Sequence, residues 1–232
     1  MTDEVLVVRG RRETVSADQA VSTSLADRVA STGIPAVRVW SPPRQLAFGP
    51  RDRAASTYEA AAAVARTAGY PPTDRAVGGR AVALTGTTVA VLVAEPVSNP
   101  RTGVEARYQR IARAIQRGLW AVGVPAQVGE PEGAFCPGSH SLSCGGKIAG
   151  VAQRVRADAA LVAGVVLVED DPDAISLLGR IYDVLSLPFD PAAIGSVEAV
   201  GGAADPNRIV VAIESRLIED RSVRLLAADQ YD

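Results

Sequence analysis

A cysteine and a lysine at the end of one glycine- and serine-rich stretch are the residues best suited to chemistry. Cys136 lies inside residues 129–146, and Lys147 follows that stretch directly. A thiol becomes a nucleophile when a neighbouring cation stabilises its thiolate, and a lysine ammonium can supply that charge or polarise an acyl oxygen. The alternatives are a small buried hydrophobe for Cys136 and a solvated strand end for Lys147. Taken alone, each residue fits its alternative better, so a nucleophilic site is at this point a hypothesis.

Two glycines between two arginines, in residues 75–80 (RAVGGR), form the second candidate. Glycines let backbone N–H groups approach an anion closely, and an arginine guanidinium adds a bidentate donor. The functional interpretation is a carboxylate or phosphate site at Arg75, Gly78 and Gly79. An ordinary surface turn is the alternative, because short glycine motifs are weak evidence by themselves.

His140 is the only histidine, so any histidine-assisted mechanism must use it. It lies close to Cys136 in the sequence, whereas the Cys–His and Ser–His–Asp arrangements of known proteases place these residues far apart. We interpret His140 as a loop residue near the thiol rather than as a base. One histidine with Cys136 and Cys144 falls short of the four ligands that structural zinc usually has, so we expect no metal site.

Composition narrows the function classes. The 232 residues are 47% hydrophobic and 22% charged, which is typical of a globular chain long enough for a substantial core. A net charge of −2 argues against nucleic-acid binding through a basic surface. No apolar run approaches the roughly 18 residues that suggest a membrane span, and no signal-peptide pattern is visible. We therefore expect a cytoplasmic protein with reduced cysteines and with neither nucleic acid nor membrane as a partner.

Hydrophobic periodicity predicts the elements that must position these residues. Apparent capping boxes at residues 16–19 and 56–59, and Asp–Pro pairs at residues 171–172 and 205–206, indicate four helix starts. A fifth helix is expected over residues 102–120. Strands are expected at residues 4–8, 37–40, 45–49, 81–84, 88–94, 147–156 and 161–168.

The last two of these strands form a predicted hairpin, and such antiparallel pairs favour the α+β class. We predict a single α+β domain over residues 1–232, with a mixed, largely antiparallel sheet flanked by helices. Residues 190–232 are expected to form a C-terminal helical extension of that domain.

Together these motifs resemble the lipoate/octanoate protein ligase and transferase family. The family's R-x-x-G-G-x-A-V run is matched by residues 75–82 (RAVGGRAV), and its K-[IV]-x-G-x-[AS]-Q-R run by residues 147–154 (KIAGVAQR). Residues 46–52 (LAFGPRD) look like the family's strand that ends in G-x-x-[DN]. The likeness implies the catalytic-domain fold of the biotin/lipoate protein ligases.

The CPG sequence at residues 136–138 is similar to one branch in particular, the octanoyl-carrier amidotransferases. In that branch the cysteine of this motif is the nucleophile. The resemblance implies an acyltransferase of protein lipoylation that passes an octanoyl or lipoyl group through a Cys136 thioester to a carrier lysine, with Lys147 at the acyl oxygen. No cofactor is implied for this reaction. The residues implied in substrate binding are Arg75, Gly78, Gly79, Gly150 and Gln153.

The implied partners are an octanoyl or lipoyl donor and lipoyl-carrier domains, of the glycine-cleavage H protein or 2-oxoacid dehydrogenase E2 type. The resemblance also implies that such carriers present acidic surfaces. Arg154 and Arg156 alternate along the predicted strand after Lys147, so both can face one side and dock a carrier.

Departures from the family's pattern keep two alternatives open. Thr85 stands where an acidic residue is usual, Val89 and Val91 stand where Asn and Ser are usual, and Arg80 replaces a small residue. One alternative is an ATP-dependent lipoate-protein ligase that forms a lipoyl-adenylate with ATP and Mg²⁺ and leaves Cys136 incidental. The other is a non-catalytic binder of lipoyl domains or acyl chains.

Overall fold

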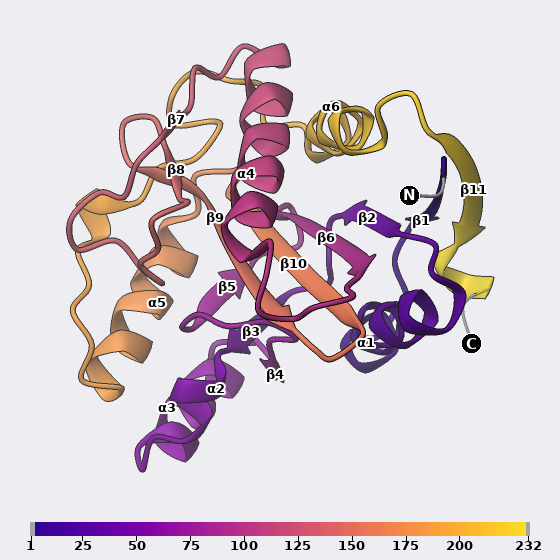
Figure 1. Cartoon of the computed structure of the whole chain (residues 1–232). Helices are drawn as coiled ribbons and strands as arrows, with labels where there is room; N and C mark the ends of the chain where they lie inside the picture. The colour runs from indigo at the N-terminus through magenta and orange to yellow at the C-terminus, as the bar shows by residue number, and fades with distance from the viewer. Residues whose placement is uncertain (1–2, 231–232) are drawn as a thin grey trace.

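An eight-stranded sheet forms the centre of the fold in the computed structural model, which describes residues 3–230 (Figure 1). Its strand order is β11-β1-β2-β6-β10-β9-β8-β7. β1 pairs in parallel with β11 and with β2, and the other neighbours pair antiparallel. The predicted α+β class with a largely antiparallel sheet is confirmed. The strands are β1 (Glu4–Arg9), β2 (Ala36–Trp40), β6 (Val89–Pro96), β7 (Gln127–Val128), β8 (Leu142–Ser143), β9 (Lys147–Val155), β10 (Ala159–Val166) and β11 (Ser222–Ala227).

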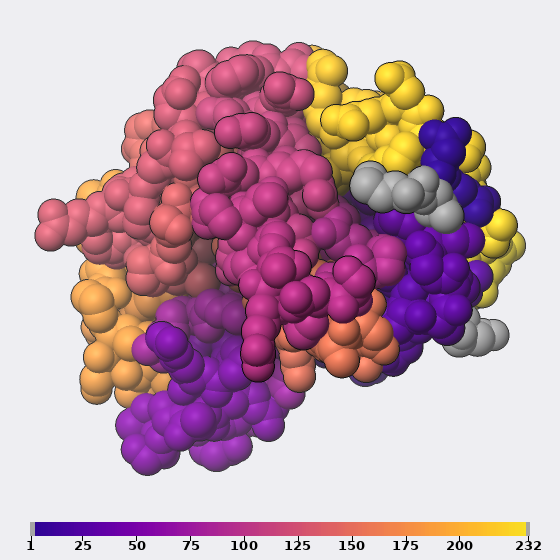
Figure 2. Space-filling view, viewed as in Figure 1, coloured from indigo at the N-terminus to yellow at the C-terminus, as the bar shows by residue number. Residues whose placement is uncertain are grey.

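Helices cover both faces of this sheet because consecutive strand residues are apolar. In β1, Val5 belongs to one apolar cluster and its neighbour Leu6 to another, as the two-residue period of a strand requires. α4 (Val104–Ala121) and α6 (Pro206–Ile218) pack on the first face, and α1 (Val15–Thr32) packs on the second. The space-filling view shows α4 beside the yellow C-terminal segment (Figure 2).

A second sheet, of three strands, carries the segment that contains Arg75. Its order is β4-β3-β5, with β3 parallel to β4 and antiparallel to β5. Its apolar residues pack with those of two helices, α3 and α5. Residues 75–81 connect β4 to β5 and meet the cysteine-containing loop. The elements of this part are β3 (Gln45–Phe48), α2 (Pro50–Arg53), α3 (Tyr58–Thr67), β4 (Pro72–Asp74), β5 (Val82–Leu84) and α5 (Pro172–Val184).

The predicted capping box at Ser16 and Gln19 is wrong. α1 starts directly after Thr14, whose side chain accepts a hydrogen bond from the N–H of Ala17. The Gln19 side chain does not turn back to the helix start, because its amide donates to the carbonyl of Asp74 at the end of β4. A long-range contact therefore replaces the local one.

The predicted capping box at residues 56–59 is also wrong. Thr57 precedes α3 and makes no side-chain cap bond. The N–H of Tyr58 instead donates to the carbonyl of Ala55, in the turn that follows α2. A short helix that the sequence pattern did not indicate thus sets where α3 begins.

The two helix starts predicted from Asp–Pro pairs are confirmed. Asp171 accepts a hydrogen bond from the N–H of Ala174 at the start of α5, and Asp205 accepts one from the N–H of Asn207 at the start of α6. The aspartate satisfies an N–H that has no partner within the helix, and proline lacks an N–H to satisfy.

The prediction of a helical extension over residues 190–232 omits a strand, β11, that lies in this part of the chain. β11 pairs in parallel with β1 at the sheet edge, and most of its residues are exposed, so it lacks the buried apolar run that predicts a strand. Short 3₁₀ turns, η1 (Pro191–Ala193) and η2 (Ala228–Gln230), complete this part. Among residues 3–230, no helix has both the length and the apolar character needed to cross a bilayer.

Candidate active site

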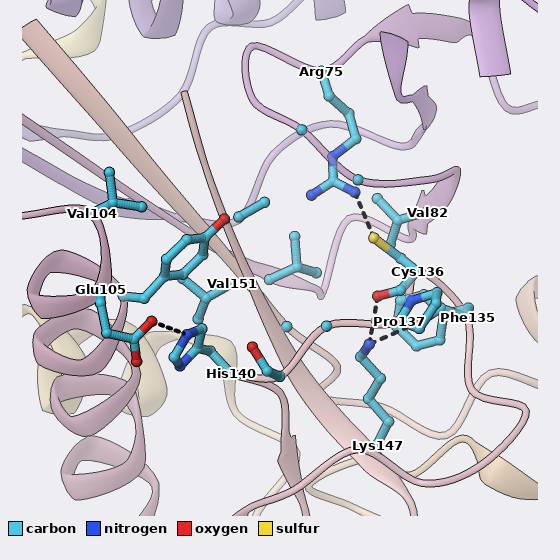
Figure 3. A pocket seen from close by; sticks show the side chains of 18 residues that line it. Arg75, Val82, Val104, Glu105, Phe135, Cys136, Pro137, His140, Lys147 and Val151 are labelled. Carbon is cyan, nitrogen blue, oxygen red and sulfur yellow. Dashed lines mark hydrogen bonds and ion pairs between the residues drawn. The ribbon is translucent and has the colours of Figure 1, made fainter. Parts of the chain in front are cut away.

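A cavity of about 280 Å³ lies between the start of α4, strand β9 and two loops (Figure 3). One loop is residues 75–81, between β4 and β5, and the other is residues 129–141, between β7 and β8. The cavity collects most of the residues implied in catalysis and substrate binding, although they come from three separate parts of the sequence. These are Arg75, Gly78, Gly79, Cys136, Lys147 and Gly150.

The sulfur of Cys136 accepts hydrogen bonds from two donors. Arg75 Nη1 lies 3.2 Å from Sγ, and the backbone N of Arg80 lies 3.1 Å from it. The same Arg75 nitrogen donates to the carbonyl of Arg80 at 2.8 Å, which fixes the guanidinium against this loop. A cation and an N–H dipole aimed at one sulfur stabilise negative charge there, as a nucleophilic thiolate requires.

The backbone of Cys136 is left-handed, with φ +44°. Few residues other than glycine adopt this conformation, and it persists only where the surroundings impose it. Here both sides of the residue are held: its N–H donates to Tyr182 Oη at 2.7 Å, and its carbonyl accepts from Lys147 Nζ at 2.7 Å. Arg75 and Lys147 approach Cys136 from different sides, the first at the sulfur and the second at the carbonyl (Figure 3).

Lys147 is fully buried, so its interpretation as a solvated strand end is wrong. Its ammonium donates to the carbonyls of Phe135 (2.9 Å) and Cys136 (2.7 Å) and to the carboxylate of Glu130 (3.0 Å). Burial lowers the pKa of Lys147, and the hydrogen bond and charge of Glu130 oppose that shift. These three acceptors match the three N–H bonds of an ammonium, so Lys147 fixes the loop that carries the thiol.

Glu130 is a site residue that sequence reasoning missed. Besides the ammonium of Lys147, its carboxylate accepts a hydrogen bond from the N–H of Gly138 at 3.2 Å, two residues after Cys136 in the sequence. Its position in the loop follows no recognisable spacing. The one signal that could have found it is the rule that a buried lysine needs a counter-ion, and this rule applies only once Lys147 is known to be buried.

Position 79 requires a glycine because the Arg75 side chain and the Cys136 sulfur lie close to its backbone. Its φ is +108°, and a Cβ on it would lie 2.5 Å from Arg75 Nη1 and 2.7 Å from Cys136 Sγ. Gly49, directly after β3, packs against the backbone of Gly79, and a Cβ on Gly49 would lie 1.8 Å from the carbonyl oxygen of Gly79. Both glycines therefore let the backbone pass close to the sulfur and its arginine.

Arg80 departs from the family's pattern, and its side chain pairs with Asp52. Arg80 Nη1 lies 3.0 Å from a carboxylate oxygen of Asp52, which is fully buried and also accepts the N–H of Gly49 at 3.1 Å. Arg80 does not line the cavity. Its backbone N–H faces Cys136 while its side chain anchors the loop to α2.

Gln153 is not brought to the cavity wall. Its side chain accepts from Arg107 Nε at 3.1 Å and donates to the carbonyl of Val104 at 2.8 Å, and its backbone N–H donates to the Tyr108 hydroxyl at 3.2 Å. These contacts tie β9 to the first turns of α4. In this structure, Gln153 holds the helix that forms one wall and does not itself line the cavity.

His140, in the loop between β7 and β8, lines the cavity and packs against the start of α4 (Figure 3). Its ring stacks on Tyr108 with centroids 4.6 Å apart, and its Nε2 lies 3.3 Å from a carboxylate oxygen of Glu105. Both of these contacts are with residues of α4 rather than with the thiol of Cys136. Among residues 3–230, no cluster of three or more His, Cys, Asp or Glu side chains is arranged to hold a metal ion.

The two arginines implied in carrier docking lie outside the cavity. Arg154 and Arg156 are both exposed near the end of β9, and Arg156 Nη1 lies 2.8 Å from a carboxylate oxygen of Asp27 on α1. The second cysteine, Cys144, packs against the apolar cluster under α4 and α6 and does not line the cavity.

A second cavity, of about 110 Å³, adjoins the first, because Arg75, Val82 and Val165 line both. Its wall on the large sheet includes Val91 and Leu92. Val91 is one of the positions where the sequence departs from the family's pattern, and here it adds apolar surface.

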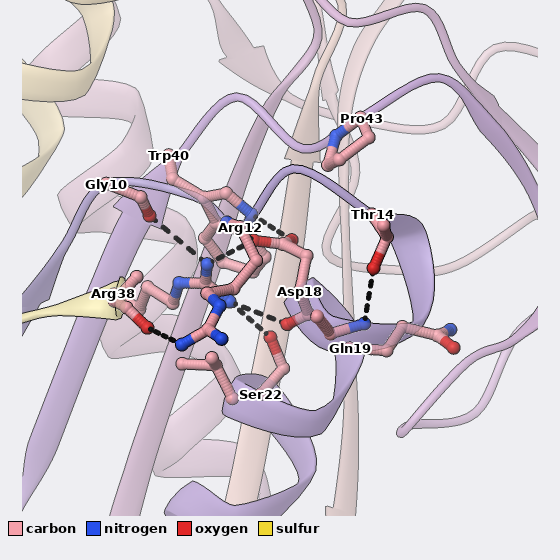
Figure 4. Close-up of polar contacts among 12 residues, drawn as sticks. Gly10, Arg12, Thr14, Asp18, Gln19, Ser22, Arg38, Trp40 and Pro43 are labelled. Carbon is pink, nitrogen blue, oxygen red and sulfur yellow. Dashed lines mark hydrogen bonds and ion pairs between the residues drawn. The ribbon is translucent and has the colours of Figure 1, made fainter. Parts of the chain in front are cut away.

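A buried polar network borders this second cavity (Figure 4). Arg38 Nη2 lies 2.5 Å from Asp18 Oδ1, and Trp40 Nε1 donates to the other oxygen of that carboxylate at 2.9 Å. Burial lowers the pKa of the Arg38 guanidinium, and the Asp18 charge opposes this shift. The ion pair joins α1 to β2 and so fixes the position of Trp40 at the cavity wall.

Comparison with known proteins agrees with these motifs. A family model described as the lipoyl protein ligase A/B catalytic domain matches residues 15–186. Two similar curated proteins are both named octanoyl-[GcvH]:protein N-octanoyltransferase. The one from Geobacillus kaustophilus (strain HTA426) is 28% identical over 144 residues, or 62% of this chain and 50% of that protein. The one from Kyrpidia tusciae (strain DSM 2912 / NBRC 15312 / T2) is 30% identical over 149 residues, or 64% of this chain and 51% of that protein.

The chain thus spans about half the length of the curated relatives it matches. Among solved structures, lipoate-protein ligase A bound with ATP has a TM-score of 0.72 at 16% identity, over 98% of this chain and 89% of that one. At this level of identity the likeness concerns the fold alone, and it confirms the predicted ligase-type catalytic-domain fold.

Proposed function

The chain belongs to the lipoyl protein ligase A/B catalytic-domain family, and from that premise we propose that it is a cysteine-dependent acyltransferase of protein lipoylation. The observation that carries this proposal is the thiol of Cys136, held at a cavity with two hydrogen-bond donors on its sulfur. The printed names of the two curated relatives, both octanoyltransferases, support the same reaction class.

The donor is an octanoylated carrier of the glycine-cleavage H type, as the names of the relatives suggest. The acceptor is a lysine on another lipoyl-carrier domain, of the 2-oxoacid dehydrogenase E2 type. Arg154 on β9 and Arg156 directly after that strand are both exposed, and they dock the acidic surface of these carriers. Charges at the rim of such a contact mainly raise the rate of encounter.

The transfer proceeds in two steps. The thiolate of Cys136 attacks the carbonyl carbon of the octanoyl–lysine amide; the C–S bond forms, the C–N bond breaks, and the departing amine takes up a proton. The amine of the acceptor lysine then attacks the thioester; a C–N bond forms, the sulfur leaves as thiolate, and the amine gives up a proton. An amide is exchanged for an amide, so the reaction needs no ATP and no other cofactor.

Lys147 has three tasks in this account. In the resting site its ammonium holds the carbonyls of Phe135 and Cys136. During the reaction one of these bonds is exchanged for the acyl oxygen, where negative charge develops. Because burial lowers the pKa of Lys147, its ammonium is also a stronger acid than a solvated lysine and supplies the proton to the leaving amine.

The acyl chain passes Arg75 and Val82 into the second cavity. This assignment is supported by the residues that line both cavities and by the apolar side chains of Val91 and Leu92 beyond them. Arg75, Gly78 and Gly79 then form the mouth of the acyl site, and Gly150 leaves room beside Lys147. Gln153 contributes by holding the start of α4.

The ligase alternative receives less support. It places Lys147 at the α-phosphate of an acyl-adenylate, where the ammonium would have to exchange one of its three acceptors, as it does in the acyl-transfer account. It also leaves the two donors on the Cys136 sulfur without a role. The same donors argue against a purely non-catalytic binder.

An assay without nucleotide separates these functions. The purified chain is mixed with an octanoylated H-type carrier and an unmodified lipoyl domain, and octanoylation of the lipoyl domain is followed by mass spectrometry. We expect transfer in the absence of ATP. Absence of transfer, together with lipoate-dependent exchange between ATP and pyrophosphate, would establish the ligase alternative instead.

A further inference from the structure

The hydroxyl of Tyr182 lies between two segments that form the thiol site. Tyr182 comes from α5, 46 positions after Cys136 in the sequence, and its oxygen accepts the N–H of Cys136 at 2.7 Å. The same hydroxyl donates to the carbonyl of Ala81 at 3.1 Å. One side-chain oxygen therefore connects the loop that carries the nucleophile to the start of β5.

The partner on the β5 side is significant because Ala81 directly follows Arg80. The backbone N–H of Arg80 is one of the two donors on the Cys136 sulfur. The chain of contacts is closed: Cys136 N–H to Tyr182, Tyr182 to Ala81, and Arg80 N–H back to the sulfur. This closed chain links the position of the Tyr182 hydroxyl to the separation between the sulfur and its backbone donor.

We propose that Tyr182 is a positioning residue that holds Cys136 in its left-handed conformation and aligns the sulfur with the N–H of Arg80. The acyl-transfer part of this inference rests on the proposed function. The part that concerns thiol reactivity stands on the geometry of this chain alone.

The surroundings of Tyr182 separate the role of its hydroxyl from that of its ring. The side chain is fully buried in the apolar cluster under α5, and its ring lies 5.3 Å from that of Phe189. A phenylalanine would fill the same space, so Tyr182→Phe removes the two hydrogen bonds of the hydroxyl and keeps the packing of the ring. A hydroxyl in such a place is unfavourable unless it is hydrogen-bonded, and here both of its bonds go to the thiol site.

The test compares Tyr182→Phe with Tyr70→Phe, which removes a hydroxyl from another buried tyrosine of the same cluster. Both changes are made with Cys144→Ala, so that Cys136 is the only thiol. The rate of Cys136 alkylation by iodoacetamide at pH 7 is measured together with the melting temperature. We expect Tyr182→Phe to slow alkylation about five- to tenfold, as the loss of a hydrogen bond or two would do, and Tyr70→Phe to stay within about twofold.

A kinetic comparison links this effect to the proposed reaction. In the transfer assay, we expect Tyr182→Phe to lower kcat by a similar factor and to leave the carrier KM unchanged, because the residue lies away from the docking surface. Alkylation of Tyr182→Phe at the wild-type rate would overturn the inference. Slow alkylation of this variant, with no acyl transfer by the wild type, would uphold the positioning role and remove the proposed function.

Amide hydrogen exchange of the wild-type chain gives a second test that does not depend on the variant folding. We expect the amide of Cys136 to exchange slowly, since its partner is a buried hydroxyl. Exchange at the rate of an exposed loop amide would mean that the bond to Tyr182 does not hold this residue, and would overturn the inference.

Discussion

Arg75 Nη1 lies 3.2 Å from the sulfur of Cys136, although the two residues are 61 positions apart in the sequence. Gly79 lies directly behind this contact, because a Cβ on it would meet both the guanidinium and the sulfur. The motif around Arg75 and the motif around Cys136 are thus two parts of one site. The arginine contributes a charged donor to a thiol as well as a wall of the cavity.

Gly79→Ala tests this contact. The added methyl group would lie 2.5 Å from Arg75 Nη1 and 2.7 Å from Cys136 Sγ, so one of the two must move. We expect single-turnover acylation of Cys136 to fall at least about 100-fold, the usual effect of losing a preorganised donor. Gly86→Ala is the matched control: its φ of +95° gives similar backbone strain, and a Cβ there meets nothing within 4 Å. Equal losses of acylation in the two variants would show that strain alone explains the effect.

Lys147→Ala should reduce both stability and activity. The change leaves two buried carbonyls and Glu130 without their common donor, so we expect the free energy of unfolding to fall by about 2–3 kcal/mol. Transfer should fall by at least about 10². Lys147→Arg should recover little of either, because a planar guanidinium cannot occupy the place of an ammonium held by three acceptors. Urea denaturation and the transfer rate measure the two effects, and a variant with more than about a tenth of the wild-type rate would remove Lys147 from the mechanism.

Reversal of the charges at Arg154 and Arg156 tests the docking proposal. We expect Arg154→Glu with Arg156→Glu to raise the KM for the carrier with little change in kcat, and to do so more strongly at low salt, where charge interactions are less screened. The control reverses Arg208 and Arg216, which are exposed on α6 and give the same change in net charge. If both double variants raise KM equally, only the overall charge matters and the docking surface lies elsewhere.

The stability of the chain at high pH should depend on Tyr182. Burial, followed by the charge of Cys136, raises the pKa of this tyrosine in the folded chain. In the unfolded chain the Tyr182 hydroxyl ionises near pH 10. Above this pH, unfolding releases a proton that the folded state retains, so the contribution of the Tyr182 hydroxyl to folding stability is lost as pH rises. The difference in unfolding free energy between wild type and Tyr182→Phe should therefore shrink by about 1.4 kcal/mol between pH 8 and pH 11. A difference that stays constant over this range would contradict the buried, protonated hydroxyl.

Local patterns in the sequence were sufficient for the elements that carry the site. The hairpin of β9 and β10 and the Asp–Pro helix starts follow from short-range periodicity and capping, and the glycine and cysteine motifs follow from residue type. β11 was missed because it lies at an exposed edge, where the alternation of buried and exposed residues is lost. The false capping box at Ser16 has a tertiary cause, the contact between Gln19 and β4.

The partners of the site residues could not be predicted in the same way. Glu130, Tyr182 and Asp52 each contact a residue of the candidate site through folding, and none of them follows a fixed spacing from it. Gln153 shows the reverse case. It matches the family's motif, yet its side chain supports α4 instead of lining the cavity. A motif therefore marks positions in the sequence without indicating what each side chain touches.

The acyl-enzyme itself is the most direct measurement. The chain is mixed with an octanoylated H-type carrier in the absence of ATP and of any acceptor, and the intact protein and its peptides are analysed by mass spectrometry. The account predicts a gain of one octanoyl group in place of one hydrogen, located on Cys136, present in Cys144→Ala and absent in Cys136→Ala. Transfer to a later acceptor with no such adduct, or undiminished transfer by Cys136→Ala, would contradict the thioester mechanism.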